Sequence, residues 1–255
     1  MEERRFSLDV EGVSILGQVY IPEQKEACPT LLLCHGIPRG TRDANDPGYP
    51  LLARKFCDAG FLTLMFNFRG TGNSGGNFDI LGWTRDLEAV IDYAYSMKEV
   101  DRKRIFLMGF SGGAAVSVYV AAKDLRVSHL ATFACPVQFH GFEDLEKAKS
   151  LVQHFRTIGI IRDREFPPSL EQWLDGFSQV RPIDEITRVS PRPLLIVHGT
   201  KDDVVGPGQA RALYNRAGEP KQMLMVQGAG HRLRLEEKAM AGALKWLRTQ
   251  AFDRD

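Results

Sequence analysis

The sequence predicts an α/β protein with a mostly parallel central sheet and helices on both of its faces. Two observations predict this class. Apolar runs of strand length alternate with amphipathic segments of helical length, and several of the runs are apolar without a break. Unbroken apolar strands are typical of sheets buried on both sides. Hydrophobic residues make up 44% of the 255 residues and charged residues 25%, which is ordinary for a water-soluble globular protein.

Each expected element follows from its own residue pattern. Residues 13–21 form a strand of an opening hairpin, and the next strand, 30–36, runs into a loop rich in Gly, Pro, Asp and Asn. Apolar runs predict further strands at 61–68, 104–110, 129–137, 192–199 and 221–228. Apolar residues at helical spacing, or a run of small residues, predict helices at 49–60, 84–100, 114–122, 209–218 and 236–250.

One segment interrupts this alternation. From about 138 to 190 no comparable strand occurs, and aromatic side chains stand among charges: Phe139, Phe142, Phe155, Phe166, Trp173 and Phe177. We therefore expect residues 1–255 to form a single domain with a small, largely helical cap insertion at 138–190. Two ordinary packing helices fit the composition equally well. We expect the insertion to set the substrate, with pocket residues Phe142, Phe155, Trp173 and Phe177.

Two serines lie in a G-x-S-x-G pattern, Ser111 and Ser74. A nucleophilic serine at such an elbow needs a strand before it, a helix after it and small residues on both sides. Ser111 has this context, because the apolar run 104–110 precedes it and a run of small residues follows. Ser74 has neither a strand directly before it nor a helix start after it, and we interpret its surroundings as a flexible loop at the rim. The pattern favours Ser111 as the nucleophile over an ordinary tight turn.

A serine hydroxyl needs a base, and the base needs an orienting acid. Of the six histidines, His231 lies in a Gly-rich loop between the last strand and the last helix, from where it can reach across the sheet edge. Asp202 and Asp203 both follow the strand 192–199, at the edge where α/β sheets place their sites. The order Ser111, then Asp202 or Asp203, then His231 predicts a Ser–Asp–His triad.

Five motifs occur in one order along the chain: CHGIPRG, FNFRGTGNSGG, GFSGG, HGTKDDVV and GAGH. Together they resemble the α/β-hydrolase superfamily over nearly everything outside the insertion. In detail the chain is most similar to bacterial carboxylesterases of the feruloyl/cinnamoyl-esterase type, which share the FRGxGxSxG loop and a modest insertion here. Those esterases often read HSQGG at the elbow, where this chain has Phe110 and Gly112 around its serine.

The resemblance implies an α/β-hydrolase fold and further site assignments. It implies Asp202 as the acid, with Asp203 as the alternative. It also implies an oxyanion hole formed by two backbone N–H groups, one from Gly112 and one from Ile37 in the loop after CHG. The serine at the elbow disfavours the superfamily members that use a cysteine or aspartate nucleophile.

We therefore expect a carboxylesterase-type serine hydrolase that cleaves esters of short-to-medium acyl or aromatic acids through an acyl-enzyme. A peptidase or thioesterase with the same triad is the alternative, and a non-catalytic ligand receptor on this fold is the alternative of another class. We expect no cofactor and no metal, because no HExxH motif or paired ligand spacing occurs.

The partner is expected to be a small-molecule ester. The formal net charge of +1 does not indicate nucleic acid or an anionic membrane surface, and no apolar stretch is long enough to cross a bilayer. No signal peptide is recognised, and the four scattered cysteines fit buried or free thiols better than disulfides or metal ligands. We expect a cytoplasmic protein. Its oligomeric state stays open, with a homodimer among the alternatives.

Overall fold

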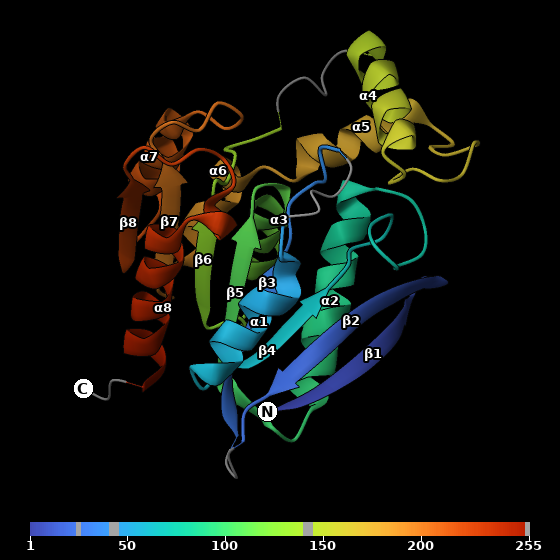
Figure 1. The fold of residues 1–255 in the computed structure, drawn as a ribbon. Coiled ribbons are helices and arrows are strands. Elements are labelled where there is room, and N and C mark those ends of the chain that lie inside the picture. The colour runs from blue at the N-terminus through green and yellow to red at the C-terminus, as the bar shows by residue number, and fades with distance from the viewer. Residues whose placement is uncertain (24–26, 41–45, 140–144, 253–255) are drawn as a thin grey trace.

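The molecule is built around one eight-stranded sheet with the strand order β1-β2-β4-β3-β5-β6-β7-β8 (Figure 1). The computed structural model describes residues 1–255 except 24–26, 41–45, 140–144 and 253–255. The strands β1 and β2 pair antiparallel, β2 joins β4 antiparallel, and every later pairing is parallel. The strands are β1 (Glu2–Val10), β2 (Val13–Ile21), β3 (Cys28–Cys34), β4 (Leu62–Phe66), β5 (Val100–Phe110), β6 (His129–Phe133), β7 (Leu194–Gly199) and β8 (Lys221–Val226).

The helices cover both faces of this sheet, as the sequence predicts. Figure 1 shows α1 and α8 in front of the strands and α2 and α3 behind them. The main helices are α1 (Gly48–Asp58), α2 (Ile80–Ser96), α3 (Gly112–Ala121), α7 (Pro207–Arg216) and α8 (Glu237–Phe252). Short 3₁₀ turns lie at η1 (Ile186–Val189) and η2 (Leu233–Leu235).

The alternation of side chains along the central strands divides the core in two. In β3, Leu31 and Leu33 pack with α1 and α8, whereas Leu32 and Cys34 pack with α2 and α3. All seven residues of β3 are buried. Because successive side chains of a strand point to opposite faces, an unbroken apolar run is what a two-sided core requires.

The segment between β6 and β7 carries the helices that the aromatic-rich stretch predicts. These are α4 (Leu145–Thr157), α5 (Leu170–Gln179) and the short α6 (Pro182–Glu185). In Figure 1, α4 and α5 lie beyond the carboxyl ends of the central strands, near the start of α2. Gly176 of α5 lies against Ile80 and Leu81 of α2, so this segment is fastened to the core through α2.

The four cysteines Cys28, Cys34, Cys57 and Cys135 are buried, and none of them forms a disulfide. Within the part of the chain that the structure describes, no three His, Cys, Asp or Glu side chains gather as a metal site would require. Among the same residues, no helix has the length and apolarity to cross a bilayer.

Candidate active site

Ser111 occupies a sharp turn between β5 and α3. Its backbone has φ 51° and ψ −120°, a conformation that residues with side chains rarely adopt. Its N–H donates to the carbonyl oxygen of Phe133 at 2.8 Å, and its own carbonyl oxygen accepts from the N–H of Ala114 at 2.9 Å. Such strain costs of order 1–3 kcal/mol and persists only where surrounding bonds hold it, as they do here.

The two outer glycines of the elbow are required by close approach. A side chain at Gly113 would place its first carbon 2.2 Å from the carbonyl oxygen of His35, and one at Gly109 would lie 2.6 Å from the Cα of Ala114. Real contacts are never this short, so only glycine lets β5, α3 and the end of β3 pack together. The G-x-S-x-G spacing is therefore a packing requirement that also exposes the serine hydroxyl.

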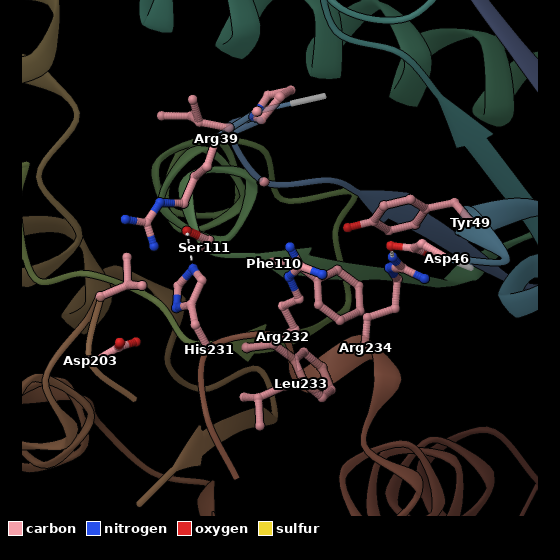
Figure 2. A pocket seen from close by; sticks show the side chains of 16 residues that line it. Arg39, Asp46, Tyr49, Phe110, Ser111, Asp203, His231, Arg232, Leu233 and Arg234 are labelled. Carbon is pink, nitrogen blue, oxygen red and sulfur yellow. Dashed lines mark hydrogen bonds and ion pairs between the residues drawn. The ribbon is translucent and has the colours of Figure 1, made fainter. Parts of the chain in front are cut away.

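Three side chains from separate loops form a hydrogen-bonded chain. The Oγ of Ser111 lies 3.0 Å from Nε2 of His231, and Nδ1 of His231 lies 2.9 Å from Oδ2 and 3.1 Å from Oδ1 of Asp202. Figure 2 shows the first of these bonds as a dashed line. Because a carboxylate only accepts, Nδ1 of His231 carries the proton and Nε2 accepts from the serine. This is the arrangement in which imidazole can remove the serine proton.

Asp202 is held in place from several sides. Its side chain is fully buried, and Oδ1 accepts the backbone N–H groups of Val204 and Val205, both at 2.9 Å. Nε2 of His198, also buried, lies 3.3 Å from Oδ2. Burial opposes ionisation, but the hydrogen bonds from His198, His231 and Val205 outweigh it and hold the pKa of Asp202 well below its usual range. Asp202 is therefore a carboxylate at neutral pH.

The adjacent Asp203 is placed differently. Its side chain is exposed and lines the cavity in front of Ser111. The structure thus brings Asp202 to His231 and leaves Asp203 on the cavity wall.

The two residues expected to supply oxyanion donors lie next to each other. A carbon on Gly112 would lie 3.5 Å from the backbone nitrogen of Ile37, and Ile37 lines the cavity that contains Ser111. The loop that carries Ile37 is fixed through His35, whose Nδ1 donates to the Gly36 carbonyl oxygen at 2.8 Å and whose Nε2 accepts the Phe68 N–H at 3.2 Å. Burial lowers the pKa of His35 to about 4, against the opposing effect of the Gly36 bond.

A cavity of about 670 Å³ opens over Ser111 and His231 (Figure 2). Its apolar walls come from separate elements: Ile37, Tyr49, Phe110, Phe133, Val204 and Leu233. Its charged residues are Arg39, Asp46, Asp203, Arg232 and Arg234. Sequence reasoning missed Tyr49, Phe110 and Leu233 as wall residues. Phe110 had a detectable signal, since it lies inside the elbow motif itself.

The predicted pocket aromatics lie elsewhere. The rings of Phe155, Trp173 and Phe177 surround Phe78, with centroid separations of 5.0, 6.2 and 5.9 Å, and are only 4%, 5% and 2% exposed. The Trp173 indole N–H donates to the Phe78 carbonyl oxygen at 3.0 Å. None of these three lines the cavity that contains Ser111. They pack the α4–α5 segment onto the residues before α2. The fourth, Phe142, lies outside the described residues.

The second G-x-S-x-G motif has a structural role. Ser74 is fully buried, its Oγ accepts the Leu16 N–H at 2.9 Å, and it donates to the Asn67 carbonyl oxygen at 2.6 Å. The Gly75 N–H also donates to the Ser14 carbonyl oxygen at 2.8 Å. The interpretation as a flexible rim loop is therefore wrong, because these bonds fasten the loop to β2.

Comparison with known proteins supports the fold and assigns the family. The chain is 31% identical over 172 residues to the uncharacterised protein YfhR of Salmonella typhi, a match that covers 66% of this chain and 53% of YfhR. The α/β hydrolase GrgF from Penicillium sp. sh18 matches with a TM-score of 0.76 and 18% identity, covering 98% of this chain and 99% of GrgF.

Est1E from Butyrivibrio proteoclasticus, solved with ferulic acid bound, matches with a TM-score of 0.74 and 19% identity, covering 98% of this chain and all of that one. These likenesses confirm the α/β-hydrolase fold. The model of the prolyl oligopeptidase family matches residues 51–252. Because that match spans most of the chain and includes the Ser111 elbow, Asp202 and His231, the chain belongs to the prolyl oligopeptidase family of serine hydrolases.

Proposed function

We propose that this chain hydrolyses carboxylic esters of short-to-medium acyl or aromatic acids, with Ser111 as nucleophile, His231 as general base and Asp202 as the orienting acid. One observation carries the proposal. The bonds from Ser111 Oγ to His231 Nε2 (3.0 Å) and from His231 Nδ1 to Asp202 (2.9 Å) form at a strained elbow that faces a cavity. A serine with a base in reach, and a base fixed by a buried carboxylate, is the requirement for nucleophilic catalysis.

In the acylation step, Ser111 Oγ attacks the ester carbonyl carbon while its proton moves to Nε2 of His231. Asp202 stabilises the positive charge that the imidazole gains and keeps Nδ1 protonated. The backbone N–H groups of Gly112 and Ile37 donate hydrogen bonds to the negatively charged carbonyl oxygen. In such sites each donor stabilises the transition state by about 3 kcal/mol. The carbon–oxygen bond to the alcohol then breaks, and the alcohol leaves with the proton from His231.

In the deacylation step, water takes the place of the alcohol. His231 removes a proton from the water while the water oxygen attacks the acyl carbon. When the bond between the acyl carbon and Ser111 Oγ breaks, His231 passes this proton to Oγ. The acid product is released and the resting hydrogen bonds form again. Apart from the ester and the water, every group in these steps belongs to this chain.

The cavity supports the proposed substrate class. Its volume of about 670 Å³ lies within the usual range for small-molecule sites, roughly 300–1,000 Å³. Tyr49, Phe110 and Leu233 offer apolar and aromatic surface to an acyl chain or ring. The fold likeness to Est1E, a protein solved with ferulic acid bound, adds support for an aromatic acid. We assign substrate selection to these wall residues, and we propose that α4 and α5 form a cap near the carboxyl ends of the central strands, beyond which they lie in Figure 1.

A peptidase is the second candidate, because the family takes its name from an oligopeptidase. A panel separates the candidates: p-nitrophenyl esters from acetyl to palmitoyl, a methyl hydroxycinnamate, an acyl thioester and aminoacyl anilides, each assayed on the parent and on Ser111→Ala. We expect ester turnover with an optimum at short chains or the aromatic ester, abolished in Ser111→Ala. An anilide or thioester optimum would replace the ester assignment. Absence of Ser111-dependent turnover on every substrate would favour a receptor.

A further inference from the structure

Charged side chains line the cavity over Ser111. Among the residues that the structure describes, three of them are arginines, Arg39, Arg232 and Arg234, and two are aspartates, Asp46 and Asp203. Arg234 forms an ion pair with Asp46 and lies over the Tyr49 ring, 4.8 Å from its centroid. This ion pair carries no net charge and forms part of the cavity wall. Arg39, Arg232 and Asp203 are exposed and line the same cavity.

Arg39 is placed to meet a substrate. It follows Ile37 by two residues on the loop that borders the elbow, and its side chain is exposed. It forms no ion pair or hydrogen bond with any residue that the structure describes. Figure 2 shows its guanidinium group pointing toward the side of the cavity where Ser111 and His231 lie. Arg232 directly follows His231 and lines the same cavity, so positive side chains flank the reacting groups on both loops.

We propose that the substrate is an ester that carries an ionised carboxylate in addition to its scissile bond, and that Arg39 binds this carboxylate. The inference rests on the proposed ester hydrolysis at Ser111 and names its substrate class. A guanidinium group presents a planar fork of N–H donors that matches a carboxylate. A singly charged carboxylate matches the single guanidinium group of Arg39, whereas the exposed Asp203 in the same cavity would repel a dianion such as a phosphate monoester more strongly. Monoesters of dicarboxylic acids and acyl esters of hydroxy acids have this chemistry.

Arg39 and Asp203 carry opposite charges in the same cavity, so substitutions at the two positions should shift the substrate preference in opposite directions. Removing the positive charge of Arg39 lowers the preference for a charged ester, and removing the negative charge of Asp203 raises it. Arg248, exposed on α8 and absent from the cavity lining, provides the matched control, since Arg248→Gln removes the same charge from elsewhere on the molecule.

The experiment compares kcat/KM for charged and neutral esters of equal carbon count, followed by pH-stat at low ionic strength. Monomethyl adipate against methyl hexanoate places the carboxylate on the acid side. The anion of 4-acetoxybutanoate against butyl acetate places it on the alcohol side. The parent, Arg39→Gln, Asp203→Asn and Arg248→Gln are assayed on both pairs.

We expect the parent to prefer the charged ester of at least one pair. The charged-to-neutral ratio falls about tenfold in Arg39→Gln, because a charge-assisted hydrogen bond is lost, and rises severalfold in Asp203→Asn. It stays unchanged in Arg248→Gln, and it falls in the parent at high salt.

A parent that prefers the neutral ester of both pairs, or a ratio that does not change in Arg39→Gln, overturns the inference while ester hydrolysis stands. Turnover of the neutral esters that persists in Ser111→Ala overturns the proposed function instead.

Discussion

The substitution Asp202→Asn tests the hydrogen-bonded chain at its buried end. Asn can keep one oxygen, and the N–H groups of Val204 and Val205, which donate to Oδ1, fix where that oxygen must lie. The amide NH₂ then takes the place of Oδ2, 2.9 Å from His231 Nδ1. Because an amide N–H donates, Nδ1 must become an acceptor, and the ring proton moves to Nε2. His231 then faces Ser111 with a proton and cannot act as its base.

The size of the effect follows from the lost charge. A carboxylate and an imidazolium with charge centres about 4 Å apart attract each other by about 4 kcal/mol at an effective dielectric constant near 20, which corresponds to about a thousandfold in rate. The wrong tautomer adds to this, so we expect kcat on p-nitrophenyl acetate to fall by about 10⁴. Circular dichroism checks that the variant is folded.

Asp203→Asn is the matched control, and we expect it to change the same kcat by less than about tenfold, since its side chain lies on the cavity wall. A folded Asp202→Asn with kcat within about tenfold of the parent, or an equal loss in Asp203→Asn, would show that Asp202 is not the acid that orients His231.

Three further predictions concern Ser111, Trp173 and His35. Ser111→Ala is expected to lower ester turnover by about 10⁴ to 10⁶, whereas Ser74→Ala keeps turnover within about tenfold but loses about 1–3 kcal/mol of stability, because the Leu16 N–H loses its buried partner. Loss of activity only in Ser74→Ala would reverse the assignment. Trp173→Ala is expected to lose about 3–5 kcal/mol in urea unfolding and to keep the ester chain-length preference, since the ring packs on Phe78 outside the cavity; a changed preference would contradict this placement. Because the pKa of His35 is lowered to about 4 in the folded state, only the unfolded chain binds its proton between about pH 6.5 and 4, so stability falls as pH falls through that window. Urea midpoints measured across it should fall more steeply in the parent than in His35→Asn, and equal slopes would show that His35 does not contribute.

The sequence predicts those parts of the fold that rest on short-range patterns. The strands β3 and β7 are buried along their whole length, so their apolar runs identify them directly. The helix α2 begins at Ile80, four residues before its amphipathic pattern becomes clear. The helix starts this early because Asp79 is its N-cap, whose side chain accepts hydrogen bonds from the N–H groups of Leu81 and Gly82. Likewise β5 begins at Val100, ahead of its apolar run, in a stretch that carries charge.

The site likewise has one part that the sequence predicts and one part that it does not. Ser111, Asp202 and His231 each follow a recognisable strand, and parallel strands bring their carboxyl ends to one edge, so their meeting could be predicted. The cavity walls could not be predicted, because they depend on contacts between distant segments. The ion pair between Asp46 and Arg234 joins residues 188 positions apart. The packing of Phe155, Trp173 and Phe177 around Phe78 could not be predicted for the same reason.

Labelling with a fluorophosphonate shows whether Ser111 is the activated nucleophile, because this reagent phosphonylates only a serine that a neighbouring base activates. The parent and Ser111→Ala are incubated with the probe, digested and mapped by peptide mass spectrometry while residual ester hydrolysis is followed. We expect one adduct per chain, on Ser111, with activity lost in proportion to labelling and no adduct in Ser111→Ala. An adduct on Ser74 or another residue, or full activity with Ser111 completely labelled, would contradict it.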